Sequence, residues 1–271
     1  MKTKNIFTFS GTGLAVLIGA SALSATGFIW PFLISENIHR PQWIFILATP
    51  IALAIFLVGV SNGNLDAKSV ALLAVLSALI AALRPLGTGA IGIEPMWFVL
   101  ILSARVFGPS FGFLLGALSM LLSALITGGL GPWLSYQAFA AAWIGLGVAC
   151  IPQKIRGRKE IAVLVIYGIV AAEFFGIAMD LQFWPWYLGS DSQLSFQAGA
   201  AISENLRNFF SYHFFSAMAW DIPRAIFTSI LLIITGQPVL HALRRAHTRA
   251  NFLTPVEFRE ISEREKQPAA K

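Results

Sequence analysis

The stretch "AKSVALLAVLSALIAALRP" (67–85) decides which kind of fold this chain adopts. Between Lys68 and Arg84 it holds fifteen consecutive uncharged residues, nearly all of them Ala, Val, Leu or Ile. A helix needs about 20 mostly apolar residues to cross the hydrocarbon core of a bilayer. The stretch therefore predicts a transmembrane helix with a basic residue at each end.

The composition of the whole chain agrees with this prediction. Of its 271 residues 56% are hydrophobic and only 12% are charged, whereas a soluble domain carries about 25% charged residues. Some of the predicted spans are short, which is tolerated where the backbone lines a protein cavity instead of facing lipid. We predict an all-α polytopic membrane protein with about eight transmembrane helices, at 13–34, 43–60, 69–83, 93–107, 111–127, 136–151, 161–181 and 222–235.

The basic residues are distributed unequally between the two sides of these spans. With the N-terminus inside, 15 of the 19 Lys and Arg residues fall on the inner side, as the positive-inside rule requires. We therefore expect both termini in the cytoplasm and the chain in the plasma membrane. The net charge of +6 is read as a topology signal, and no nucleic-acid partner is expected.

Three regions follow from this pattern. We expect two N-terminal transmembrane helices in 1–64, a six-helix core in 65–249 and a cytoplasmic tail in 250–271. The first span resembles a signal peptide at "ASALSA" (20–25), because small residues mark cleavage sites. Hydrophobicity continues through Ile34, which is too long for a typical signal peptide, so we expect a retained helix.

Sequence motifs typical of nucleotide-binding sites and of zinc proteases are absent. The chain contains no GxxxxGK[ST] or HExxH sequence, and its four histidines are not spaced as metal ligands. The single cysteine, Cys150, excludes an internal disulfide framework, and we expect it to be a small buried side chain. We predict no metal, no cofactor and no enzymatic activity, so any transport must draw its energy from a partner or an ion gradient.

Small residues recur at intervals of four in two spans. Residues four apart share a helix face, and small side chains there let another helix approach closely. The glycine run Gly108, Gly112 and Gly116 predicts internal packing. The alanine series Ala74, Ala78 and Ala82 faces either the N-terminal helices or a separate subunit. Arg105, at a predicted inner helix end, is expected to snorkel to the interface.

Polar and aromatic residues gather at the predicted outer face. Glu173 is the main candidate, because a carboxylate inside a span costs about 2.5–3.5 kcal/mol on insertion scales; it either binds a ligand or pairs with Arg84 or Arg224. The tryptophans either form an interfacial belt or stack on a planar ligand. The candidate binding residues are Trp133, Gln137, Glu173, Asp180, Trp184, Trp186, Asn205 and Asp221.

The long stretch "RPLGTGAIGIEPMWFVLILSARVFGPSFGFLLGALSMLLSALITGGLGPWLSYQAFAAAWIGLGVACIP" (84–152), with "FWPW" (183–186), "WDIPRAI" (220–226) and "LRRA" (243–246), resembles the substrate-binding S component of energy-coupling factor (ECF) transporters, of an actinobacterial type. The resemblance covers about 65 to 252. It implies a six-helix core that binds a vitamin-like solute at the extracellular face.

The resemblance also implies partners and a substrate class. An alanine motif on the first core helix, matched by Ala74, Ala78 and Ala82, would meet a transmembrane T subunit coupled to a pair of ABC ATPases. A corrinoid such as cobalamin is the first substrate expected and a thiamine precursor the second; a metal ion is not expected, since the chain begins Met1-Lys2 and lacks the Met-His start of the nickel and cobalt carriers. The alternative from another class is an intramembrane enzyme acting on a lipid-linked substrate, with Glu173 or Asp180 as general base.

Overall fold

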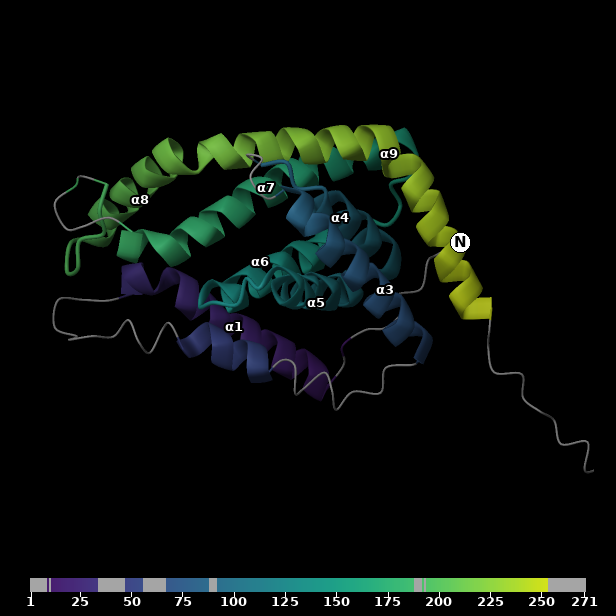
Figure 1. Cartoon of the computed structure of the whole chain (residues 1–271), viewed down its shortest axis with the longest axis horizontal. Coiled ribbons are helices and arrows are strands. Elements are labelled where there is room, and N and C mark those ends of the chain that lie inside the picture. Colours follow the sequence, from purple (N-terminus) through teal and green to yellow (C-terminus); the bar gives the residue numbers. More distant parts are fainter. Residues whose placement is uncertain are drawn as a thin grey trace, which may run out of the picture.

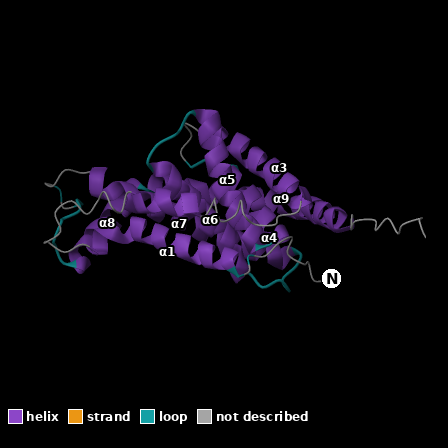
Figure 2. Ribbon diagram, turned by 90° about the horizontal axis from the view of Figure 1, so that it is seen from below, coloured by secondary structure: helices purple, strands orange, loops and turns teal. Residues whose placement is uncertain are grey.

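The computed structural model describes residues 9, 11–33, 47–55, 67–87, 92–187, 192 and 194–252. Within these residues the regular structure is helical throughout, with no strand (Figures 1 and 2). The elements are α1 (Thr12–Leu33), α3 (Ala67–Leu83), η1 (Arg84–Gly87), α4 (Met96–Phe107), α5 (Pro109–Thr127), α6 (Trp133–Gly147), η2 (Val148–Cys150), α7 (Arg158–Tyr187), α8 (Ile202–Ser216) and α9 (Met218–Phe252). Residues 47–55 are also helical.

Six of the described helices are long and apolar enough to cross a membrane: Thr12–Phe32, Ala67–Gly87, Pro109–Thr127, Trp133–Cys150, Arg158–Pro185 and Met218–Thr248. The apolar helix α4 is shorter, and the predicted span 43–60 lies partly outside the described residues. The prediction of an all-α polytopic membrane protein is confirmed. The structure adds α8, a helix between the predicted spans 161–181 and 222–235.

The centre of the bundle is the pair α5 and α6 (Figure 1). A side chain at Gly112 would collide with the backbone of Gly145, and one at Gly116 with the backbone carbonyl of Ala141. Glycine therefore lets the two helix backbones touch, as small residues do in membrane proteins generally. The predicted internal packing of the glycine run is confirmed for these two positions, while Gly108 forms the joint between α4 and α5 with a φ of 104°.

The outer helices of the bundle turn apolar side chains away from the protein. Buried residues make up 67% of the α5 span but only 22% of the α9 span. On α9 the exposed side chains include Ile226, Ile233 and Ile234. A large apolar surface of this kind is typical of a protein surrounded by lipid.

The long helices α7 and α9 lie side by side and follow the long axis of the molecule (Figure 1). At one end of the molecule α7 finishes, α8 lies across and α9 begins; we call this the α8 end. The N-terminal helix α1 packs on α6, α7 and α8, with Phe28 against Tyr136 and Trp143 Nε1 donating to Ser21 Oγ at 3.2 Å. Helix α1 is therefore part of the wall of the bundle.

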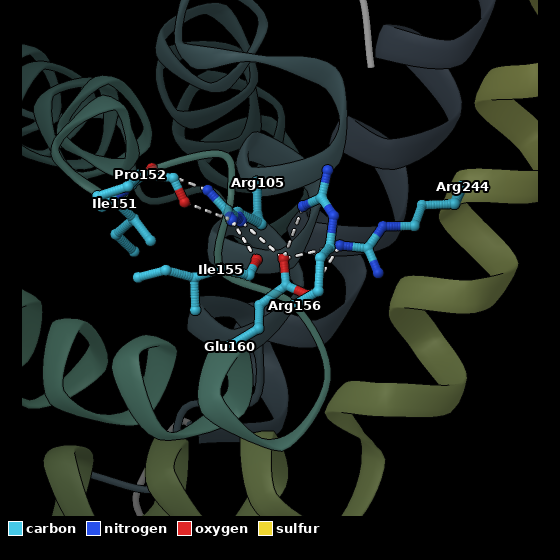
Figure 3. A network of polar contacts seen from close by, with 7 residues as sticks. All are labelled: Arg105, Ile151, Pro152, Ile155, Arg156, Glu160 and Arg244. Atoms are coloured by element: carbon cyan, nitrogen blue, oxygen red, sulfur yellow. Dashed lines mark hydrogen bonds and ion pairs between the residues drawn. The ribbon is translucent and has the colours of Figure 1, made fainter. Parts of the chain in front are cut away.

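A charged network lies at the opposite end (Figure 3). Arg105 Nε donates to Glu160 Oε1 at 2.8 Å, with both side chains at most 1% exposed. The guanidinium also donates to the carbonyls of Ile151, Pro152 and Ile155 at 2.9–3.0 Å. Our expectation that Arg105 snorkels to the interface is wrong, because its charge is buried and paired.

Two further arginines bind the same carboxylate at this end. Arg244 of α9 and Arg156 of the α6–α7 loop also bind the carboxylate of Glu160, at 2.7 and 3.2 Å (Figure 3). Cys150, which we expected to be buried, is exposed, because α6 gives way to η2 before this residue and the chain turns toward the basic loop. We refer to the group around Glu160 as the Arg105 network.

Candidate binding site at the α8 end

A cavity of about 330 Å³ lies at the α8 end, between α7, α8 and α9. Its wall combines three aromatic rings with charged groups, which is the usual composition of a small-molecule site. The lining residues are Phe175, Gly176, Met179, Asp180, Tyr212, Ser216, Ala217, Trp220, Asp221 and Arg224. They come from the second half of α7, the end of α8 and the first two turns of α9.

Arg224 holds one side of this cavity in place. Its guanidinium donates to Asp221 one turn earlier on α9 and to both carboxylate oxygens of Glu94, at 3.2 and 3.3 Å. Glu94 also accepts a hydrogen bond from Trp97 Nε1, which ties the start of α4 to the same group. At Gly176 on α7 an added side chain would overlap the Asp221 carboxylate, so glycine gives that carboxylate its room.

His213 of α8 lies between two carboxylates of α7. Its Nδ1 is 2.8 Å from Asp180 Oδ2, and its Nε2 is 3.7 Å from Glu173 Oε2. The hydrogen bond with Asp180 raises the pKa of His213 above its usual value, against a smaller lowering by burial, and the charges of Asp221 and Glu173 act in the same direction as Asp180. Residues 33 and 40 positions apart in the sequence thus form one polar group.

Negative charge is in excess at this end. Four carboxylates, those of Glu94, Glu173, Asp180 and Asp221, meet the guanidinium of Arg224 and the imidazole of His213, and the charge of Arg84 also acts on Glu94. With Arg84 included, the group carries a net charge of −2 with His213 neutral and −1 with His213 protonated. Uncompensated charge among apolar helices is expensive, so the arrangement favours the binding of a positive or hydrogen-bond-donating group.

Helix α8 turns several phenylalanine side chains outward and two asparagine side chains toward the protein. Phe210, Phe214 and Phe215 are exposed, whereas Asn205 and Asn208 are buried. Both amides bond inward to the preceding loop: Asn205 pairs with the backbone of Gln197 at 2.8 and 2.9 Å, and Asn208 donates to Ser195 O at 3.3 Å. We infer that α8 lies against lipid with its apolar side and covers the polar cavity with the other.

Trp184 and Asn205 lie outside the cavity lining. Helix α7 continues through Tyr187, so Trp184 is on a helix and not in a loop. It is completely buried among Phe209, Tyr212 and Phe32, and its Nε1 donates to Leu194 O at 2.6 Å. Both residues hold α8 and its loop in place, and the side chain of Trp186 lies outside the described part of the chain.

Trp133 and Gln137 lie at the start of α6, away from the cavity lining. Gln137 Oε1 accepts a hydrogen bond from Arg84 at 2.8 Å, and Arg84 also donates to Ser123 Oγ at 3.4 Å. The ring of Trp133 packs directly on Gly131. These residues join the ends of α3, α5 and α6. Arg84 is thereby engaged with α5 and α6, and Glu173 contacts His213 in place of either arginine that we considered as its partner.

Sequence reasoning singled out Asp180, Asp221 and Glu173, all of which belong to this polar group. It missed His213 and Glu94, and it considered Arg224 only as a partner for Glu173. The one available signal was the recurrence of Glu173 and Asp180 seven residues apart on one helix face, which required a partner from elsewhere. That partner stands on α8, a helix that the sequence pattern did not predict.

A second cavity, of about 610 Å³, lies between α1, α6 and α7. Its wall is almost entirely apolar and includes Trp143, Val170 and Phe174. The hydroxyls of Ser21 and Tyr167 already form hydrogen bonds within this wall, Ser21 with Trp143 Nε1 and Tyr167 with the carbonyl of Ile144. The cavity lacks the polar groups that orient a solute.

The alanine stripe on α3 faces away from the bundle. Ala74, Ala78 and Ala82 are exposed, whereas Leu73, Leu76 and Ile80 on the opposite side of the helix are buried. The stripe therefore does not serve packing within the described part of the chain.

These features define a polytopic helical membrane protein with a polar pocket at one end of the bundle and an exposed stripe of small residues on an outer helix. A family model described as "ECF transporter, substrate-specific component" matches residues 68–235. Because the match spans well over half of the chain, the chain belongs to this family, which confirms the resemblance found in the sequence. Among curated proteins and among solved structures no match was found.

Proposed function

We propose that the chain captures a small vitamin-like micronutrient in the α8-end cavity, from the extracellular side of the plasma membrane. As the substrate-specific component of an ECF transporter, it would release the solute inward when a T subunit and a pair of ABC ATPases drive the complex. The observation that carries this proposal is the cavity itself, in which aromatic rings and surplus carboxylates meet inside an apolar bundle.

The dimensions of the cavity bear on the choice of micronutrient. Ligand pockets have volumes of about 300–1,000 Å³, and 330 Å³ lies at the small end. A corrinoid macrocycle is several times larger than a single heterocyclic ring, so the cavity favours the thiamine precursor over the corrinoid. An aminopyrimidine ring would stack on Trp220 or Phe175 while its amino group donates to Asp180.

Charge placement supports the proposed orientation. The Arg105 network and the basic loop around Arg156 lie at the end opposite the cavity, which the positive-inside rule assigns to the cytoplasm. The cavity would then open on the extracellular side. The exposed stripe of Ala74, Ala78 and Ala82 is the proposed contact with the T subunit, because small side chains allow a close helix crossing.

The proposal is tested by equilibrium dialysis of the purified chain in detergent against a labelled pyrimidine precursor of thiamine, thiamine itself and cobalamin. We expect saturable binding of the precursor, weakened about tenfold in Trp220→Ala, since an aromatic contact contributes about 0.5–1.5 kcal/mol beyond its area. Trp133→Ala is the matched control and should leave the affinity unchanged. Loss of binding in Trp133→Ala alone would move the site to the start of α6, and binding of none of the three solutes would contradict the proposed substrate class.

A further inference from the structure

Three side chains from three different helices converge beside the cavity. Glu173 of α7, His213 of α8 and Asp221 of α9 each offer one ligand atom, and these atoms all lie within 4.8 Å of one another. We propose that Glu173, His213 and Asp221 bind a divalent metal ion on the wall of the cavity. A site of this kind is absent from the sequence pattern, where the histidines show no metal-ligand spacing.

The histidine has the environment that a metal ligand requires. Metal-bound histidines usually give their second ring N–H to a carboxylate, which fixes the tautomer and the orientation of the ring. Here Asp180 Oδ2 is 2.8 Å from Nδ1, so Nε2 is the nitrogen that faces Glu173 and Asp221. Asp180 is thus a positioning residue for the site.

Asp221 supplies an independent observation. Its side chain is 1% exposed, and one oxygen, Oδ1, accepts from Arg224. The other oxygen, Oδ2, has no hydrogen-bond partner among the described residues. A buried carboxylate oxygen without a partner is costly, and a cation held together with Glu173 and His213 would satisfy it.

Distances and charge both agree with a cation. Zinc bonds to nitrogen and oxygen are about 2.0–2.2 Å, which puts tetrahedral ligand atoms about 3.4 Å apart, so atoms at the observed limit of 4.8 Å must approach one another by about 1.4 Å. Glu173 has the freedom for this movement, since its side chain is one-third exposed. A divalent ion would also neutralise the net charge of −2 at this end.

The three ligand atoms limit which metal ions this site would prefer. One imidazole nitrogen and two carboxylate oxygens suit zinc and neighbouring first-row divalent ions, whereas calcium and magnesium prefer oxygen alone. Three protein ligands leave at least one coordination position free, and Asp221 also lines the cavity. That position would face the solute, so the inference here rests on the proposed function: a ring nitrogen or hydroxyl of the solute would complete the coordination sphere.

The experiment uses the full chain, purified in detergent and stripped of metal with a chelator. Zn²⁺ alone is titrated calorimetrically, and Co²⁺ alone is followed by its visible absorption, without any solute present. We expect one ion per chain and a cobalt spectrum typical of low coordination number. Absence of saturable binding would overturn the inference while leaving the micronutrient proposal standing, because that proposal is tested with solutes and not with metal.

Variants decide whether the ion binds at these residues. Glu173→Gln and His213→Ala should each abolish the cobalt spectrum, and Asp180→Asn should weaken the affinity about 10–100-fold, as loss of an outer-shell partner does. His241→Ala, on an exposed position of α9, should bind as the wild type does. Glu173→Gln guards against misfolding, because it keeps the size and shape of a side chain that is one-third exposed. Unchanged binding in both Glu173→Gln and His213→Ala would refute the assignment.

Discussion

Replacing Glu160 by Gln removes the one carboxylate that the Arg105 network contains (Figure 3). Arg105 is completely buried, and the glutamine amide would leave its guanidinium without a counter-charge. Breaking a buried ion pair by removing one partner costs about 3–5 kcal/mol. Since proteins are stable by only about 5–15 kcal/mol, we expect Glu160→Gln to lose a large part of the free energy of unfolding.

The assay is equilibrium unfolding of the purified chain in mixed micelles, followed by tryptophan fluorescence. Arg156→Gln is the matched control: it removes a contact to the same carboxylate, but the Arg156 side chain is 38% exposed, so it should cost no more than about 1 kcal/mol. The pair Arg105→Met and Glu160→Gln should be non-additive, since with Met at position 105 the loss of Glu160 no longer leaves a buried guanidinium there without its counter-charge. Equal losses in Glu160→Gln and Arg156→Gln would refute the view that this network joins α4, α7 and α9.

Three further predictions concern packing and partners. Gly116→Ala should destabilise the bundle by about 1–3 kcal/mol because the new methyl group meets the backbone of α6, whereas Gly19→Ala, with open space around it, should not; thermal unfolding in detergent checks both. Ala78→Phe should abolish co-purification with the T subunit and uptake while the isolated chain still binds its solute; co-purification retained at the wild-type level would separate the stripe from the interface. Phe32→Ala should destabilise α8 by about 1 kcal/mol, which would appear as roughly fivefold faster amide exchange over α8 and unchanged exchange over α5. Exchange over α8 at the same rate in Phe32→Ala and in the wild type would mean that α1 does not hold α8.

Much of the fold was predictable because lipid imposes a simple rule on sequence. The long apolar runs that lie within the described residues became helices, and the glycines at 112 and 116 marked a close contact between α5 and α6. The ends of the helices, and the helix α8 between two predicted spans, were harder to predict. The α7 helix runs on past Pro185. Helix α8 escaped notice because Asn205 and Asn208 face inward while Phe210, Phe214 and Phe215 face outward, the reverse of the pattern that marks a helix in a soluble protein.

The site was predictable only in part. Carboxylates inside apolar spans attract attention on grounds of cost, which is how Glu173 and Asp180 were found, whereas Asp221 was chosen as a polar residue of the predicted outer face. Their partner His213 depends on how α8 folds back over α7, and Arg224 pairs with Glu94 across 130 positions of sequence. The tryptophans were less informative, because an indole can pack in a small hydrophobic core, as Trp184 does, as readily as it can stack on a ligand.

The most direct test of the account is mass spectrometry of small molecules released from the chain purified from its native membranes. We predict one nitrogen-containing heterocyclic compound in stoichiometric amount, retained in Trp133→Ala and recovered in a smaller amount from Trp220→Ala. Recovery of no solute, or of a solute held equally well by both variants, would contradict the claim that the cavity at the α8 end is where this transporter subunit binds its substrate.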